Sequence, residues 1–517
     1  MKPTRHLAPW TAAAVLAAAL GSTPVPGATR AAGAGAALPQ APPAAATKPE
    51  PAPGGSGTSG TAAAPQGPAA ATGTGGAPGA ATPQPASAAA GVAPPEKGFY
   101  FGPTSCGSSS CHGSVTPRRT FGVRQDEYFI WQKKDRHAQA YGVLFNDRSR
   151  LIARRLHLGE AADSPACRSC HALAVPARLQ RGPLELEDGI SCEGCHGAAG
   201  GWLEGHRSES WTHQQSVAAG MTDLRDVQAR AAVCLACHLG GPGKTVNHDL
   251  IAAGHPQLAF ELDNYSEGMP AHWLPFADRP AGQSDRDTHG TRAWAVGQAA
   301  GLSADLEQIA RRARGGNLRD ESTPWPEFSQ LSCDSCHHSL AQERWRTAPD
   351  RPGRPGLPRI SPARYAILRH LVAAVAPERQ AALEGGVEQL TAVLSRLGTP
   401  PAEVAAAAER LGRETAEIAP RLDRRRWDDA LARRLLLAVA QNEGGLETAD
   451  YASAQQAALA VQTLVSQLLA SEPRRLRSGL AGAAEGLAAE LQNPYSFDPG
   501  RFAERLAQLA RQLREAP

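Results

Sequence analysis

The chain is poor in the large side chains that usually form a hydrophobic core. Aromatic residues make up 5% of its 517 residues, and it contains three methionines. Beyond the N-terminus, no segment approaches 18 uninterrupted apolar residues, so we expect no stable membrane span in the mature protein. The formal net charge is +3, with no concentrated basic patch and no Gly-rich phosphate loop. These absences leave nucleic-acid and nucleotide binding without support.

Cysteine is also scarce, yet none of the ten cysteines is left over. They form five pairs, and each pair is followed directly by a histidine. Four pairs have C-x-x-C-H spacing, whereas the first has four residues between its cysteines. The motifs are Cys106 and Cys111 with His112, Cys167 and Cys170 with His171, Cys192 and Cys195 with His196, Cys234 and Cys237 with His238, and Cys333 and Cys336 with His337.

The C-x-x-C-H spacing lets two thiols form thioethers with the vinyl groups of one haem, while the adjacent histidine binds the iron. The five motifs therefore predict five covalently attached haem c groups, with the ten cysteines as attachment points and the five motif histidines as proximal ligands. The macrocycles would supply the buried apolar mass that the aromatic content lacks. We expect each motif to open or close a helical turn.

Zinc knuckles and redox dithiols also use paired cysteines. Neither requires a histidine directly after the second cysteine, and here every pair has one. With 16 histidines in 517 residues, a given position is histidine about one time in thirty, so five coincidences are improbable. Haem attachment is the interpretation that this counting favours.

The N-terminus predicts export. A charged start is followed by an apolar run from Ala8 to Leu20, which is too short to span a bilayer. We expect a signal peptide over residues 1–30 and a periplasmic mature protein. Residues 31–96, almost entirely Ala, Pro, Gly, Ser and Thr, predict a disordered linker that cannot bury enough apolar surface to fold.

The rest of the chain divides by composition into two regions. Residues 97–350 hold all five motifs, and we expect a mainly α domain of short helices and loops around stacked haems. Residues 361–517 are rich in Ala, Leu, Arg and Glu and predict a C-terminal α-helical domain. Its apolar stripes recur at helical spacing. They are Ala457, Val461, Leu464 and Leu468, and Phe502, Leu506, Leu509 and Leu513.

The sixth ligand of each iron decides its chemistry. A second histidine makes a low-potential electron carrier, methionine raises the potential, and an open position admits a substrate. Met221 and Met269 can serve two haems at most. Ten histidines outside the motifs compete for five positions, and the residues alone leave the assignment open. They are His137, His157, His206, His213, His248, His255, His272, His289, His338 and His370.

The haem region resembles the multihaem cytochrome c-554 family, which is related by haem arrangement to hydroxylamine oxidoreductase. Four stretches carry the resemblance, which covers about half of the chain. They are Gly189 to Gly197 with His206 following, Arg136-His137-Ala138, Asn247 to Pro256 with Met269 to Trp273 following, and Cys336 to Leu340 leading to Trp345-Arg346.

The resemblance implies distal ligands that are remote in sequence from their motifs. It indicates His137, His206, His248, His255 and His272 for this role. His248 and His255 are seven residues apart and would share one helix face if the segment is helical, so they could serve two different irons. A histidine bonded to a haem propionate is the alternative for either of them. His370 is expected to be a packed helix residue.

The sequence is compatible with two functions. The first is a periplasmic pentahaem cytochrome that transfers electrons between redox protein partners, which requires only ligation, burial and tuning of potentials. The alternative is a multihaem oxidoreductase that acts on a small nitrogen or sulfur compound at one high-spin haem. No catalytic side chain is identified for either.

Overall fold

The computed structural model describes residues 98–118, 122–274, 290–315, 325–337, 357, 359–469 and 474–515. The predicted signal peptide and linker lie outside the described residues, as do the candidate ligands His289 and His338. The C-terminal end of the segment that resembles the cytochrome c-554 family, including Trp345 and Arg346, lies outside them as well.

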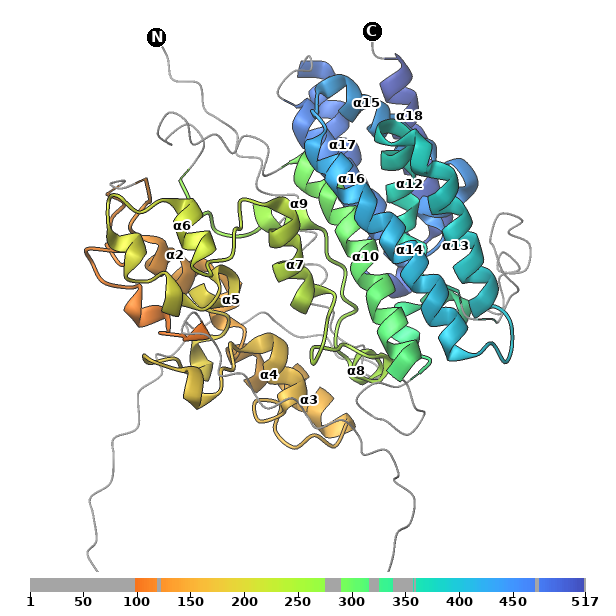
Figure 1. Ribbon diagram of the computed structural model, residues 1–517. Helices are drawn as coiled ribbons and strands as arrows, with labels where there is room; N and C mark the ends of the chain where they lie inside the picture. Colours follow the sequence, from red (N-terminus) through yellow and green to blue (C-terminus); the bar gives the residue numbers. More distant parts are fainter. Residues whose placement is uncertain are drawn as a thin grey trace, which may run out of the picture. The chain divides into compact units, whose positions relative to one another are not determined.

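The described chain is mainly α-helical, which confirms the predicted fold class (Figure 1). Extended pairing in these residues is confined to isolated bridges. They join Tyr100 to Gln180, Gly241 to Lys244 and Leu331 to Ile360.

Short helices carry the motif region, and several of them end at a motif histidine. α4 ends at the histidine of motif two, α5 at that of motif three and α7 at that of motif four. In motif five, a short 3₁₀ turn begins at Cys333. The expectation that a motif opens or closes a helical turn is confirmed for these four. The helices are α2 (Glu127–Lys134), α3 (Asp147–Arg155), α4 (Pro165–His171), α5 (Cys192–His196), α6 (His213–Ala218), α7 (Val227–His238), α8 (His248–Ala253) and α9 (Leu262–Glu267).

Longer helices form a bundle, and they bury the two apolar stripes that the sequence predicts. Every residue of both stripes is buried, on α16 and α18 respectively. Asp498 caps α18 by accepting hydrogen bonds from the backbone N–H groups of Gly500 and Arg501. The bundle helices are α10 (Thr291–Gly315), α12 (Ala363–Val375), α13 (Gln380–Leu394), α14 (Pro401–Arg424), α15 (Asp429–Gln441), α16 (Tyr451–Leu468), α17 (Arg474–Glu490) and α18 (Pro499–Glu515).

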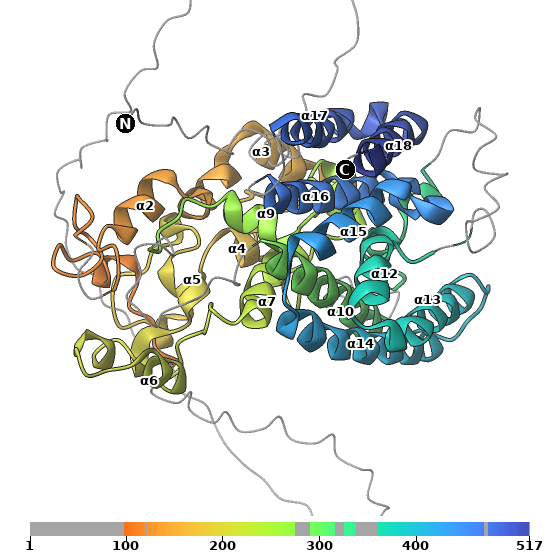
Figure 2. The ribbon, with the colours of Figure 1, turned by 90° about the horizontal axis from the view of Figure 1, so that it is seen from above.

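α10 joins the bundle to the motif region. It lies along α14 and also contacts α12, α7 and α9 (Figures 1 and 2). Small residues allow this close packing: a Cβ at Gly297 would lie 2.7 Å from the Leu262 side chain of α9. One hydrophobic core runs from Val227 on α7, through Trp294 on α10, to Leu513 on α18. The bundle therefore fixes the helix that carries motif four, and the domain boundary near residue 350 stays a prediction from composition.

Candidate haem site

The cysteines of the five motifs are all free thiols, and none of the ten forms a disulfide. The two cysteines of motif five are exposed, and the other eight are partly buried. Every thiol is thus available for a thioether bond.

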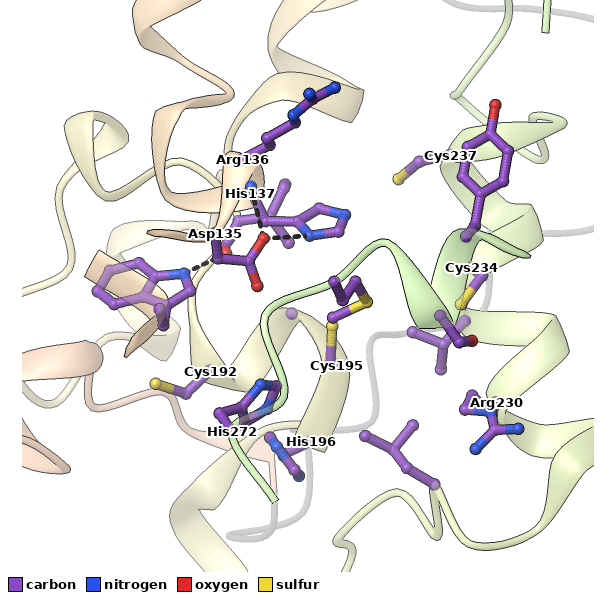
Figure 3. Close-up of a pocket in the computed structure, with 18 of the residues that line it drawn as sticks. Asp135, Arg136, His137, Cys192, Cys195, His196, Arg230, Cys234, Cys237 and His272 are labelled. Atoms are coloured by element: carbon purple, nitrogen blue, oxygen red, sulfur yellow. Dashed lines mark hydrogen bonds and ion pairs between the residues drawn. The ribbon is translucent and has the colours of Figure 1, made fainter. Parts of the chain in front are cut away.

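Four of the five motifs line one cavity of about 2400 Å³. Drug-sized ligands occupy pockets of about 300–1,000 Å³, so this cavity is large enough for several macrocycles. Four of the predicted distal histidines line it as well. They are His137, His206, His255 and His272. Figure 3 shows His137 and His272 in this cavity with the cysteines of motifs three and four.

Each motif histidine faces one of the five predicted distal histidines. We number the resulting sites by their motifs. The ring centroids are 6.3 Å apart for His112 and His206 (site 1), 6.5 Å for His171 and His255 (site 2), 6.4 Å for His196 and His272 (site 3), 6.0 Å for His238 and His137 (site 4) and 6.1 Å for His337 and His248 (site 5).

These separations fit one metal ion between each pair of rings. A histidine–metal bond is about 2.0–2.1 Å, and the ring centre lies about 1.1 Å behind the bonding nitrogen, so two opposed imidazoles have centroids about 6.3 Å apart. The ring planes are nearly parallel at site 1, at 2°, and nearly perpendicular at site 2, at 83°. The described residues contain no group of three or more His, Cys, Asp or Glu that could hold a metal ion in the manner of a zinc knuckle.

Comparison with known proteins agrees with this geometry. Residues 106–197 match the model of the family described as cytochrome c554 and c-prime. Over these residues the chain is similar to the cytochrome c554 family, which supports its identification as a c-type cytochrome. The match spans motifs one to three and ends before motif four. No curated protein and no solved structure matches the chain.

This similarity has direct consequences for chemistry. A c-type cytochrome binds haem covalently and takes part in electron transfer. No helix in the described part of the cytochrome is both long and apolar enough to cross a bilayer.

Hydrogen bonds at the outer ring nitrogen orient most of the paired histidines. The Nδ1 atoms of His171, His206 and His255 lie 2.9, 2.6 and 2.8 Å from the carbonyl oxygens of Ala140, Leu203 and Pro256. An imidazole that donates from Nδ1 presents Nε2 as its free lone pair, the arrangement typical of metal-bound histidine.

Two of the rings contact carboxylates instead. His112 Nδ1 lies 3.1 Å from Glu127 Oε2, and His137 Nδ1 lies 2.9 Å from Asp135 Oδ1 (Figure 3 shows the second contact). Sequence reasoning missed both carboxylates. Asp135 has a local signal, because it precedes His137 by two residues and also caps the turn that carries it. Glu127 is remote from His112 and had no comparable signal.

Burial keeps several of these rings neutral. It lowers the pKa of His196 and of His238 to about 4, and it also lowers the pKa values of His206, His255 and His272. Neutral imidazole is the form that binds a metal, so burial prepares these side chains for ligation.

Site 5 lies outside the cavity and is held by a different contact. The backbone N–H of His248, the first residue of α8, donates to Glu327 Oε1 at 2.8 Å. Glu327 is also paired with Arg312 of α10, at 3.1 Å, and both side chains are buried. Burial lowers the pKa of Arg312 to about 10. The bundle thus positions the distal histidine of site 5 through a buried ion pair.

The remaining histidines have other partners or are exposed. His213 Nε2 lies 2.9 Å from Asp223, and His370 Nε2 lies 2.6 Å from the buried Glu447, as befits the packed helix residue predicted for His370. His157 is exposed. Met221 and Met269 line the cavity, but each motif histidine already faces a histidine.

Proposed function

We propose that this cytochrome carries five haem c groups, each bound by two histidines, and transfers single electrons between redox proteins of the periplasm. The observation that carries the proposal is the set of five opposed histidine pairs, whose separations fit one iron each. A six-coordinate iron has no position for a substrate, which favours a carrier over a catalyst.

Each haem would be held by two cysteines and two histidines with different roles. The paired thiols anchor the macrocycle, the motif histidine binds one face of the iron, and the remote histidine binds the other. The haem supplies one-electron chemistry between ferrous and ferric iron. Nine of the ten paired histidines are partly buried, which limits their contact with water and so reduces the reorganisation that accompanies electron transfer.

Contacts between motifs support a continuous path for electrons. The thiols of Cys106 and Cys192 are close enough to shift each other's pKa, downward for Cys106 and upward for Cys192, which places the edges of sites 1 and 3 near each other. The thiols of Cys170 and Cys237 act on each other in the same way between sites 2 and 4, with the pKa raised for Cys170 and lowered for Cys237.

Two further contacts complete the path. Cys195 of site 3 lies within electrostatic range of Cys234 and Cys237 of site 4. Gln257, two residues after the site 2 ligand His255, lies close enough to Cys333 of site 5 to oppose the rise that burial causes in the pKa of that thiol. We infer the order 1–3–4–2–5, with sites 1 and 5 at the ends of the path.

The periplasmic location rests on two arguments. Covalent haem attachment is completed outside the cytoplasm, and the N-terminal sequence has a charged start followed by a short apolar run. The electron donor and acceptor are proposed as redox proteins, because one-electron exchange requires close approach but no dedicated substrate pocket.

Spin state tests the proposal against the alternative of a nitrogen- or sulfur-compound oxidoreductase. We expect the oxidised, purified full-length protein to show only low-spin ferric haem by electron paramagnetic resonance and visible spectroscopy. Added cyanide or nitric oxide should leave both spectra unchanged. A high-spin ferric signal that shifts on addition of either ligand would replace the carrier proposal with the enzyme.

A further inference from the structure

The outer nitrogens of two proposed iron ligands are within hydrogen-bonding distance of carboxylates shielded from water, whereas the contact of His248 Nδ1 with the exposed Asp249 is long, at 3.9 Å. The ring of His112 at site 1 contacts the carboxylate of Glu127, and the ring of His137 at site 4 contacts that of Asp135. At site 2, both ligands contact backbone carbonyls, those of Ala140 and Pro256. The sites are therefore chemically unequal, although all have two histidines.

Both carboxylates are fixed in place by the backbone. Glu127 Oε1 accepts a hydrogen bond from the backbone N–H of Arg124 at 2.7 Å, which leaves Oε2 for His112. Asp135 Oδ1 accepts from both the backbone N–H and the ring of His137, each at 2.9 Å. Their side chains are 15% and 5% exposed, so water screens neither contact strongly.

A charged acceptor acts on the iron through the ring. A carboxylate draws the Nδ1 proton toward itself more strongly than a carbonyl does, and the ring then donates more electron density from Nε2. Greater donation stabilises ferric over ferrous iron and lowers the reduction potential. A neutral carbonyl acceptor orients the ring with a much smaller effect of this kind.

We propose that Glu127 and Asp135 are positioning residues that hold the haems at sites 1 and 4 at lower reduction potentials than the haem at site 2. The proposal rests on the bis-histidine ligation proposed above. In the inferred order, sites 4 and 2 are neighbours, so this difference favours electron movement from site 4 to site 2. Asp135 thereby gives this step of the path a direction.

The experiment is a spectroelectrochemical titration of the full-length holoprotein and of two variants, Glu127→Gln and Asp135→Asn. Each amide removes the charge and keeps one acceptor oxygen, which in Glu127→Gln the ring of His112 and the backbone N–H of Arg124 must share. We expect one of the five redox components to move to higher potential in each variant. The expected change is about tenfold in that haem's equilibrium with a fixed mediator, which is about 59 mV for a one-electron couple.

A matched control separates this effect from simple loss of a nearby negative charge. Asp126 precedes Glu127, has a side chain 12% exposed, and is bound by Arg124 at 3.0 Å rather than by a ligand ring. Asp126→Asn should leave all five components in place. Equal shifts in Asp126→Asn and Glu127→Gln would overturn the proposal in favour of a general electrostatic effect.

The outcomes also distinguish this proposal from the one on which it rests. An unchanged titration in Glu127→Gln and Asp135→Asn, with wild-type low-spin spectra retained, would overturn the tuning role while bis-histidine ligation stands. A high-spin, cyanide-sensitive signal from site 1 or site 4 in the wild-type protein would overturn the ligation itself.

Discussion

His248 and His337 face each other with ring centroids 6.1 Å apart, and neither lines the cavity that the other four pairs share. The two cysteines of the same motif are exposed. Site 5 is therefore structurally separate from the other four sites, so its ligation can be perturbed without rearranging them.

Removal of the site 5 distal histidine should make one haem high-spin and leave the other four low-spin. We expect His248→Ala to give one high-spin haem that binds cyanide, because the iron loses its sixth ligand. Electron paramagnetic resonance with a cyanide titration measures the change. His213→Ala, which removes a cavity histidine paired with Asp223 instead, should keep the wild-type spectrum. A low-spin His248→Ala spectrum would show that another group serves site 5.

The buried pair of Glu327 and Arg312 should matter for both stability and ligation at site 5. Replacing Glu327 by Gln leaves the Arg312 charge buried without compensation, a change that costs about 3–5 kcal/mol in comparable proteins. We expect a lower denaturation midpoint and weakened ligation by His248. The control variant Glu409→Gln breaks an exposed ion pair between Glu409 of α14 and Arg314 of α10. It should change the denaturation midpoint and the ligation by His248 little. Equal effects of both variants would contradict the role given to burial.

Glu193 should anchor the start of the described chain to motif three. Its buried carboxylate accepts hydrogen bonds from the backbone N–H groups of Phe101, Gly102 and Ala199. Hydrogen bonds to charged groups contribute about 1.5–3 kcal/mol, so Glu193→Gln should lower the melting temperature and expose this segment to limited proteolysis. Glu187→Gln, at an exposed position nearby, is the control. Wild-type protease resistance in Glu193→Gln would refute the anchoring role.

The stability that Glu261 contributes should fall as pH rises through neutrality. Burial, together with the charge of Asp263, raises its pKa from 4.5 to about 7. The folded state then binds more protons than the unfolded state between these values. The contribution is complete below about pH 4.5 and is lost as pH rises through about 7. Asp263 and Glu267 on α9, Arg230 on α7 and Arg364 on α12 are the charged groups that surround this cluster.

Melting temperatures at about pH 5.5 and about pH 8 measure this effect. Because Glu261→Gln removes a contribution that is lost at high pH, we expect its melting temperature at about pH 8 to rise relative to that at about pH 5.5 when compared with wild type. The surface variant Glu403→Gln should keep the wild-type difference. An identical pH profile in wild type and Glu261→Gln would contradict the assignment.

The motifs could be recognised from sequence because two thioethers and one axial bond to the same haem require two cysteines and a histidine within a short stretch of chain. The two apolar stripes on α16 and α18 were readable for the same reason, since a helix imposes its own period. The distal histidines are different. Spacing left ten candidates open, and the family resemblance selected five that the fold brings opposite the motif histidines.

Other features depend on tertiary contacts that no local pattern records. Glu127 reaches His112 because α2 packs against the first motif, and Glu327 reaches His248 through α10. α10 packs along α14, which is remote from it in sequence, and its Gly297 and Gly301 admit the side chains of Leu262 and Arg364 at close range. Such contacts could not be derived from composition or period.

Near-infrared magnetic circular dichroism of the oxidised full-length protein tests the central claim most directly, because its charge-transfer band reports the pair of axial ligands on each ferric haem. We expect an intensity equal to five bis-histidine haems per chain, with no band from any other ligand pair. An intensity equal to four or fewer, or a band from histidine–methionine or high-spin haem, would contradict the account.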